Sequence, residues 1–225
     1  MMSGSSAGPD AALLFKKLLP FCLSVALYFI VLIPYENPSL LAALIKCTPI
    51  FNLMVFVQNL QPKNTRWSFS TKILMGQLCC CIGDIFLLWN EYFIFGMLAF
   101  MVAHLNYIVA FGFKPLRPTV GLVLVAVSAI VVSTLYHGLV GSLLIGVPMY
   151  IAIINVMVWR ALARITNPWS IAHLGPCIGS VLFAVSDLMI GIDKFVNPIA
   201  HSQILIMSSY YAAQLGISLS VLEIT

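Results

Sequence analysis

Charge is what this sequence has least of. Only 8% of its 225 residues are Asp, Glu, Lys or Arg, whereas about 25% of the residues in soluble globular domains are charged. Hydrophobic residues make up 61% of the chain, which excludes a soluble domain with an ordinary charged surface. The chain also lacks a basic soluble segment interleaved with aromatic residues, so nucleic acid is excluded as a partner.

The sequence also lacks the short motifs that hold common cofactors. It has no Walker motif, no dinucleotide-binding fingerprint and no Cys-x-x-Cys pair, so we expect neither a nucleotide nor a redox cofactor. Hydrolytic zinc sites usually present three strong ligands, often paired histidines. Here a single His, His104, lies near the middle of an apolar stretch, and no His-Glu-x-x-His motif occurs. We therefore predict no metal and no other cofactor.

Cysteine is present, but not in a pattern that predicts disulfides. All six cysteines fall within apolar stretches, whereas disulfide frameworks belong to small secreted domains. We expect free thiols that pack as small hydrophobic side chains. The six are Cys22, Cys47, Cys79, Cys80, Cys81 and Cys177.

Long apolar stretches dominate what is there. Each has roughly 17–22 residues, the length that a helix needs to cross a hydrocarbon core of about 30 Å. Helices are expected because every backbone polar group must be satisfied within the span. We therefore predict an all-α polytopic bundle of eight transmembrane helices over residues 15–225, preceded by a disordered cytoplasmic tail at residues 1–14. The eight stretches are 15–33, 40–60, 73–89, 92–112, 119–136, 141–159, 171–192 and 203–222.

The basic residues predict the orientation of this bundle. If the stretches alternate in direction, nine of the eleven Lys and Arg residues fall on one side, and the opposite loops hold only Lys194. By the positive-inside rule both termini are then cytoplasmic, in agreement with an even number of spans. Lys46 is left inside a span. The nine are Lys16, Lys17, Lys63, Arg66, Lys72, Lys114, Arg117, Arg160 and Arg164.

Two aspartates lie inside apolar stretches, and we expect the bundle to bring them together. Asp84 follows Gly83 in the third stretch, and Asp187 follows Ser186 in the seventh. An ionised Asp in a spanning helix costs at least ~2.5–3.5 kcal/mol on insertion scales, so each needs a partner or a function. Because the two stretches look alike and are four spans apart, they suggest a 4+4 parallel repeat. The fifth stretch is nearly featureless and is expected at the periphery.

Three roles are open for Lys46. It lies about six residues from the non-cytoplasmic rim of its helix, so it either extends to that rim, or is the counter-ion of a buried Asp, or clamps a phosphate. Lys46, Asp84 and Asp187 all fall in the non-cytoplasmic third of the bilayer, which predicts a polar pocket open to one leaflet. Two carboxyls in different surroundings are the arrangement from which a general acid and a general base are made.

Five further polar residues are candidates for substrate binding. His104 and Tyr107 share one face of the fourth stretch, and Tyr210 and Gln214 share one face of the eighth. These four come at or just above the bilayer middle and would form the floor of the pocket. For His104, and for Asn155 of the sixth stretch, the alternative is a hydrogen bond between helices.

Short motifs spread along the chain resemble one family, the YhhN-type lysoplasmalogenases, and most strongly its animal members. The resemblance covers all eight stretches. It is carried by ALIKCTPI (43–50), GDIFLLW (83–89), AHLNY (103–107) followed by AFGFKPL (110–116), LFAVSD (182–187) and MSSYYAAQ (207–214).

This resemblance implies an enzyme of the endoplasmic-reticulum membrane. The reaction would be hydrolysis of the vinyl ether of a lysoplasmalogen, a lysophospholipid taken from the bilayer, to a fatty aldehyde and glycerophosphocholine or glycerophosphoethanolamine. Asp84 and Asp187 match the two family aspartates, and which of them is the acid and which the base stays open. The headgroup preference and a homodimeric state also stay open.

The implied reaction fits the residues. A vinyl ether is hydrolysed by protonation of its β-carbon, and water then captures the oxocarbenium ion. The enzyme needs an acid for the first step and a carboxylate for the second, the division of labour that glycosidases give to paired carboxyls. The alternative is a transporter or receptor for a lipid or small solute, because eight spans around a charged pocket would suit that function as well.

Overall fold

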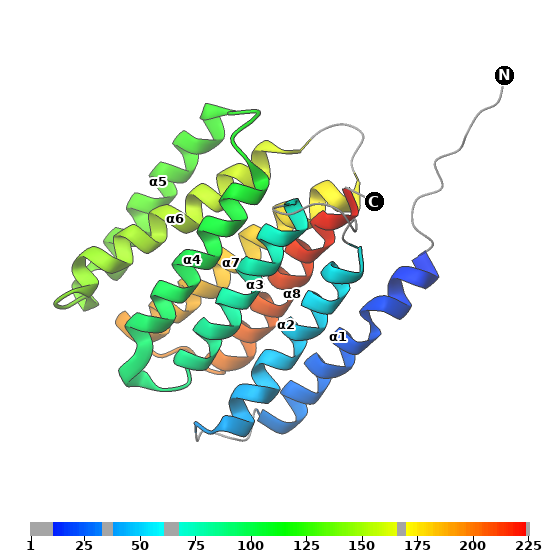
Figure 1. The fold of residues 1–225 in the computed structure, drawn as a ribbon. Coiled ribbons are helices and arrows are strands. Elements are labelled where there is room, and N and C mark those ends of the chain that lie inside the picture. The colour runs from blue at the N-terminus through cyan, green and yellow to red at the C-terminus, as the bar shows by residue number, and fades with distance from the viewer. Residues whose placement is uncertain (1–10, 33–37, 61–67, 166–169, 224–225) are drawn as a thin grey trace.

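The computed structural model describes residues 11–32, 38–60, 68–165 and 170–223. Within these ranges the chain forms eight long helices and no strand (Figure 1). Three short 3-10 turns, η1 (Asn90–Tyr92), η2 (Tyr136–Gly138) and η3 (Ser220–Glu223), extend them. The long helices are α1 (Ala11–Leu32), α2 (Leu40–Leu60), α3 (Phe69–Phe86), α4 (Phe93–Phe111), α5 (Pro118–Leu135), α6 (Leu143–Ala163), α7 (Ile171–Phe195) and α8 (Ser202–Leu219).

The predicted all-α bundle is confirmed, because the described residues contain eight helices long and apolar enough to cross a membrane. Some boundaries were wrong. Helix α1 begins at Ala11, so residues 11–14 of the predicted tail are helical, while residues 1–10 lie outside the described residues. Helix α3 ends at Phe86, three residues early, and α7 continues to Phe195, close to Asn197 and Pro198, where a residue before proline disfavours the helix.

The bundle turns apolar side chains outward, as expected of a protein dissolved in lipid, and keeps its few charged and polar side chains within an apolar core. Leu122, Ile130 and Ile145 are among the many large apolar side chains that face outward. By contrast, Asp84 and His104 are buried within the bundle. All six cysteines are free thiols, as predicted.

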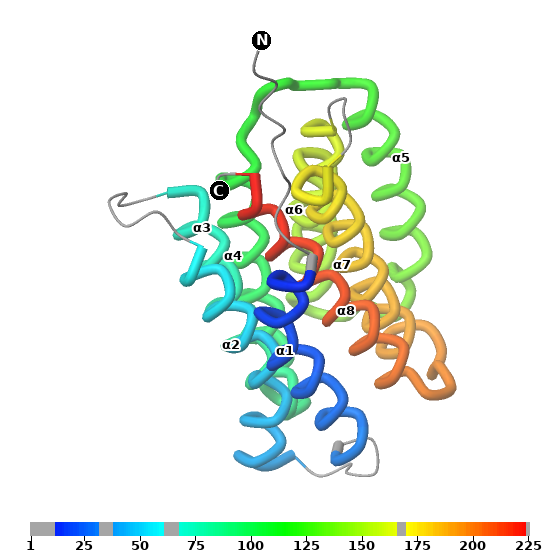
Figure 2. The backbone as a smooth tube through the Cα atoms, turned by 90° about the vertical axis from the view of Figure 1, so that its right-hand side faces the viewer, coloured from blue at the N-terminus to red at the C-terminus, as the bar shows by residue number. Residues whose placement is uncertain are grey.

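Neighbouring helices pair as antiparallel hairpins, and α4, α6, α7 and α8 join these hairpins into one bundle. Helices α1 and α5 lie at opposite edges (Figure 1), and only 6% of the α5 span is buried, which confirms its predicted peripheral position. The α4–α5 and α7–α8 connections lie at opposite ends of the bundle (Figure 2). Which end is cytoplasmic, and whether the two halves form a repeat, stay predictions.

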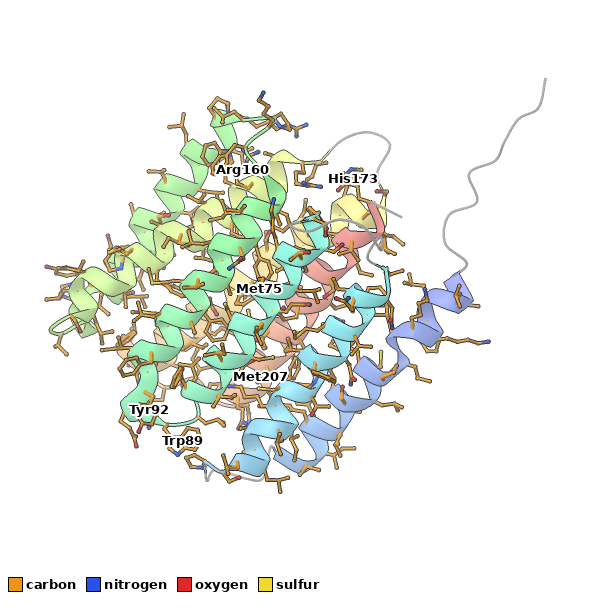
Figure 3. The ribbon with its side chains drawn as sticks, viewed as in Figure 1. Met75, Trp89, Tyr92, Arg160, His173 and Met207 are labelled. Carbon is orange, nitrogen blue, oxygen red and sulfur yellow. The ribbon has the colours of Figure 1, made fainter. Side chains whose placement is uncertain are left out.

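The two ends differ in chemistry. One end, here called the basic face, is where α3, α5 and α7 begin, and it carries Arg160 and His173; Trp89 and Tyr92 lie at the other end, here called the opposite face (Figure 3). Helix α1 begins and α8 ends at the basic face. The other described cations of this face are Lys16, Lys17, Lys72, Lys114, Arg117 and Arg164.

Candidate active site

The first of two carboxylate clusters surrounds Asp84 and joins α2, α3 and α8. Lys46 Nζ lies 3.3 Å from Asp84 Oδ1, and the Tyr210 hydroxyl donates to Asp84 Oδ2 at 2.6 Å. Tyr211 in turn donates to the Lys46 carbonyl at 2.9 Å, which fixes this part of α2. The Asp84 side chain is only 3% exposed. Both of its oxygens are therefore satisfied, and Lys46 is the counter-ion of a buried Asp rather than a side chain that extends to the rim.

The second cluster surrounds Asp187 and joins α4, α6 and α7. The Tyr150 hydroxyl donates a short hydrogen bond to Asp187 Oδ2, and His104 Nε2 lies 3.0 Å from the same hydroxyl and 3.6 Å from Asp187 Oδ2. Because the hydroxyl has one hydrogen and gives it to Asp187, His104 Nε2 must supply the hydrogen of its own contact with Tyr150. His104 Nδ1 is buried without a hydrogen-bond partner. The result is a directed chain from His104 through Tyr150 to Asp187.

Aromatic rings separate the two clusters. The Phe183 ring centroid lies 4.8 Å from that of His104 and 5.3 Å from that of Tyr210, so it contacts both sides. The Phe100 ring centroid lies 6.0 Å from the ring centroids of both Phe183 and Tyr210. We call Phe100 and Phe183 the ring layer. The two carboxylates are close enough across this layer to interact electrostatically, but they share no hydrogen bond.

The small residue before each Asp contacts a neighbouring helix. A Cβ at Gly83 would lie 2.7 Å from the ring of Phe100 and 3.2 Å from the carbonyl oxygen of Gly96, so only glycine allows α4 and its ring to pack here. Before Asp187, the Ser186 hydroxyl donates to the Ile206 carbonyl of α8 at 3.1 Å. The small residue before Asp84 thus marks a tight point of the α3–α4 pair, whereas the one before Asp187 forms a hydrogen bond between α7 and α8.

Asp187, but not Asp84, lines an apolar cavity. This cavity of about 290 Å³ lies between α4, α5, α6 and α7, and apolar side chains such as Met97 and Val131 make up most of its wall. Its polar lining residues are Tyr150, Asn155 and Asp187, whereas Asp84 and Lys46 do not line it. A long apolar space with one carboxyl on its wall suits an amphiphile with a single hydrocarbon chain.

A third polar network joins α3, α4 and α8. Tyr107 donates to Gln214 Oε1 at 3.3 Å, and Gln77 Nε2 donates to Ser218 at 2.7 Å. Gln214 Nε2 and Gln77 Oε1 remain without a partner. Among the described residues, no three His, Cys, Asp or Glu side chains lie where they could together hold a metal ion.

The single polar pocket expected from residue depths was therefore wrong. Apart from Asn155, the predicted residues divide among three clusters, and the rings of Phe100 and Phe183 lie between the Asp84 and Asp187 clusters. The hydrogen bond between helices expected of Asn155 is confirmed, since its amide donates to Ser128 of α5 at 2.6 Å. Asn155 also lines the cavity, and its role in substrate binding stays a prediction.

Sequence reasoning missed Tyr150 and the ring layer. A signal for Tyr150 was available: Val147, Tyr150, Ile154, Val158 and Leu162 recur at helical spacing on the α6 face that lines the cavity. No comparable signal marks Phe100 and Phe183, because the chain has 14 Phe residues in apolar surroundings.

Comparison with known proteins identifies the family. The model of the YhhN family matches residues 41–221, which include both carboxylate clusters. The chain belongs to the YhhN family. Lysoplasmalogenase TMEM86A of Bos taurus is 42% identical over 214 residues, which cover 92% of this chain and 89% of the relative. Lysoplasmalogenase TMEM86B of Homo sapiens is 37% identical over 221 residues, which cover 97% and 91%. No solved structure matches the chain.

Proposed function

We propose that this YhhN-family protein hydrolyses the vinyl ether of lysoplasmalogens. The products are a fatty aldehyde and glycerophosphocholine or glycerophosphoethanolamine. The names of the bovine and human relatives support this substrate class. The observation that carries the proposal is that Asp187, bonded to Tyr150, opens onto a long apolar cavity.

Asp187 is the proton-transfer group of the proposed reaction. Its protonated carboxyl gives the proton to the β-carbon of the vinyl ether, and the α-carbon and ether oxygen then share the positive charge of an oxocarbenium ion. The Asp187 carboxylate next takes a proton from the water that attacks the α-carbon. The hemiacetal that results collapses when its hydroxyl proton moves to the glycerol oxygen, which leaves as the alcohol while the aldehyde forms. The apolar cavity wall keeps other water away.

Tyr150 and His104 position Asp187 for both steps. The Tyr150 hydroxyl holds one carboxyl oxygen in place, and His104 holds the hydroxyl. A carboxyl fixed through two neighbours loses little orientation when its proton moves, which is the condition for efficient proton transfer.

Asp84 stabilises the cation from behind the ring layer. It is paired with Lys46 and bonded to Tyr210, and it interacts electrostatically with the Asp187 region across Phe183. Its negative charge, together with the faces of the aromatic rings, favours a positive charge forming in the cavity. In this division of labour both aspartates act, but only Asp187 touches the substrate.

The test is aldehyde release by the purified protein in detergent. We expect hydrolysis of a 1-alkenyl lysophospholipid but not of its saturated 1-alkyl analogue, and in D2O one deuterium at the carbon next to the aldehyde carbonyl. Release of a fatty acid from an acyl lysophospholipid instead would contradict the proposal. A transporter or receptor would release no aldehyde in detergent, and transport itself needs a sealed membrane.

The proposal places the protein in the endoplasmic-reticulum membrane with both termini cytoplasmic. The resemblance to the animal lysoplasmalogenases supports the organelle, and the cations gathered at the basic face support the orientation. Fractionation and protease protection of terminal tags test the two claims, and a lumenal terminus would overturn the orientation.

A further inference from the structure

Lys194 is an exception to the charge distribution of this protein. Apart from Lys46, which is buried against Asp84, every other Lys and Arg of the sequence belongs to the basic side of the predicted topology. Lys194 lies in the last turn of α7 at the opposite face, and it is exposed. The asymmetry that orients the chain would be stronger without this lysine, so its position calls for another reason.

Neutral groups hold the Lys194 ammonium. Its Nζ lies 3.3 Å from Asn90 Oδ1 and 4.6 Å from the centroid of the Phe93 ring, over its face. Among the described residues no carboxylate lies within ion-pair distance of it, and the neighbouring Asp193 instead accepts the backbone N–H of Ile199 at 2.6 Å. The ammonium is therefore held in place but keeps its charge available for an anion.

This cation stands at one end of the cavity. Phe93 and Phe195 line the cavity, and their rings contact each other with centroids 5.8 Å apart. The Phe93 ring thus contacts the ammonium of Lys194 and also forms part of the cavity wall. We call Asn90, Phe93, Lys194 and Phe195 the α7 rim.

Two arginines beyond the other end of the cavity are already engaged. Arg160 is fully buried and donates to the carbonyls of Gly112 at 2.6 Å and Pro115 at 2.8 Å. Arg164 forms an ion pair with Glu223 and donates to the Phe111 carbonyl at 3.1 Å. Neither of these two guanidinium groups is left to bind a ligand in the cavity.

The cavity lining extends farther from the Asp187 cluster toward Leu162, here called the long arm, than toward the α7 rim, here called the short arm. From Tyr150 to Leu162 the lining of α6 extends for about 18 Å, and from Asp187 to Phe195 the lining of α7 extends for about 12 Å at helical rise. A lipid chain reaches about 15 Å, half of the ~30 Å hydrocarbon core. The chain therefore fits the arm toward Leu162, and the shorter arm toward the α7 rim receives the glycerol and its headgroup.

We propose that the α7 rim binds the phosphate of a lysophospholipid, with Lys194 as the cation that recognises it. This inference rests on the proposed function and adds the direction in which the substrate lies. Lys46, for which a phosphate clamp was one reading, is occupied by Asp84. Lys194 Nζ donates to the phosphate, the Asn90 amide adds a second donor, and the vinyl ether lies at Asp187, about two helical turns below.

The test compares two vinyl ethers that differ only in the headgroup. Full-length protein in a nonionic detergent is assayed with a 1-alkenyl lysophosphatidylethanolamine and with 1-alkenylglycerol, which lacks the phosphate. We expect Lys194→Gln to lower the preference for the phospholipid by about 10-fold, through KM rather than kcat, because a hydrogen bond to a charged group is lost. Lys194→Arg should keep most of the preference. Lys17→Gln, on exposed α1 at the basic face, is the matched control.

Salt and a free anion sharpen the test. Added salt should raise the KM of the wild type for the phospholipid and leave that of Lys194→Gln nearly unchanged, because the rim is exposed. Inhibition of the wild type, but not of Lys194→Gln, by inorganic phosphate would show that the rim recognises phosphate itself. If inorganic phosphate inhibits neither protein, but Lys194→Gln has still lost the preference for the phospholipid, the rim recognises phosphate only as part of the lipid. Equal loss on both substrates, or no change in preference, would overturn the proposal.

A failure of the proposed function would look different. If the wild type releases no aldehyde from either vinyl ether, calorimetric binding of a 1-alkyl lysophosphocholine still tests the α7 rim. About 10-fold weaker binding by Lys194→Gln would support the phosphate site without the chemistry, and equal binding by both proteins would overturn it.

Discussion

Asp84 and Asp187 are the same residue type in similar local sequences, yet the fold gives them opposite surroundings. Asp84 has a lysine and a phenol on its two oxygens, its side chain is 3% exposed, and it lies away from the cavity. Asp187 has a phenol and an imidazole as partners, is 13% exposed and faces the cavity. A carboxylate paired with a lysine serves the fold and the local field, whereas one beside an apolar space and without a fixed cation is available for proton transfer.

The largest expected effect is on stability at the Asp84 cluster. Asp84→Asn leaves the Lys46 ammonium buried without a negative partner. Lys46→Met leaves the Asp84 carboxylate buried without a positive partner. Each should lower the free energy of unfolding by about 3–5 kcal/mol, whereas the double variant should recover a large part of that loss. Unfolding by SDS titration of the three variants measures this coupling. Additive losses would mean that the pair does not stabilise the fold as a unit.

A smaller effect is expected at Tyr150, which belongs to the Asp187 cluster. Tyr150→Phe removes the hydroxyl that holds Asp187 and contacts His104, so kcat for the vinyl ether should fall about 10-fold with little change in KM. Tyr28→Phe is the control, because it removes another buried phenol hydroxyl, one bonded to Gln203 outside the cavity. An unchanged kcat in Tyr150→Phe would remove Tyr150 from the positioning of Asp187.

An effect of similar size concerns the long arm of the cavity. Leu124 lines this arm on α5, one turn from Ser128, the partner of Asn155. Leu124→Trp should lower the preference for long over short alkenyl chains by about 10-fold, because several methylene groups lose their place in the cavity. Val125→Trp on the exposed side of the same helix is the control. If Leu124→Trp and Val125→Trp have the same preference for long over short alkenyl chains, the hydrocarbon chain does not bind in the long arm.

The sequence was sufficient to predict what depends on composition and length. Eight spans, the outer position of α5 and the interior position of both aspartates follow from the hydrophobic pattern and from the cost of charge in lipid. The sequence left three alternative roles for Lys46, and the structure decides among them because Asp84 lies within ion-pair distance.

What the sequence could not predict depends on the rotation and approach of the helices. Tyr150 meets Asp187 because α6 and α7 turn those faces toward each other, and the two clusters are separate because Gly83 admits the ring of Phe100. A pattern of residue types carries no information about such contacts between distant segments. Depth alone therefore placed all the polar residues in one pocket, although rings divide them.

The central claim is that the carboxyl facing the cavity transfers the proton. Its most direct test is kcat per folded molecule for Asp187→Asn and Asp84→Asn, measured side by side on one 1-alkenyl lysophospholipid. Asp187→Asn should lose at least ~10²-fold, the usual value of a positioned proton-transfer group, with its fold intact. Asp84→Asn should lose no more than about 10-fold in the molecules that remain folded, since its charge acts across the ring layer. Equal losses, or a larger loss in Asp84→Asn, would contradict the account.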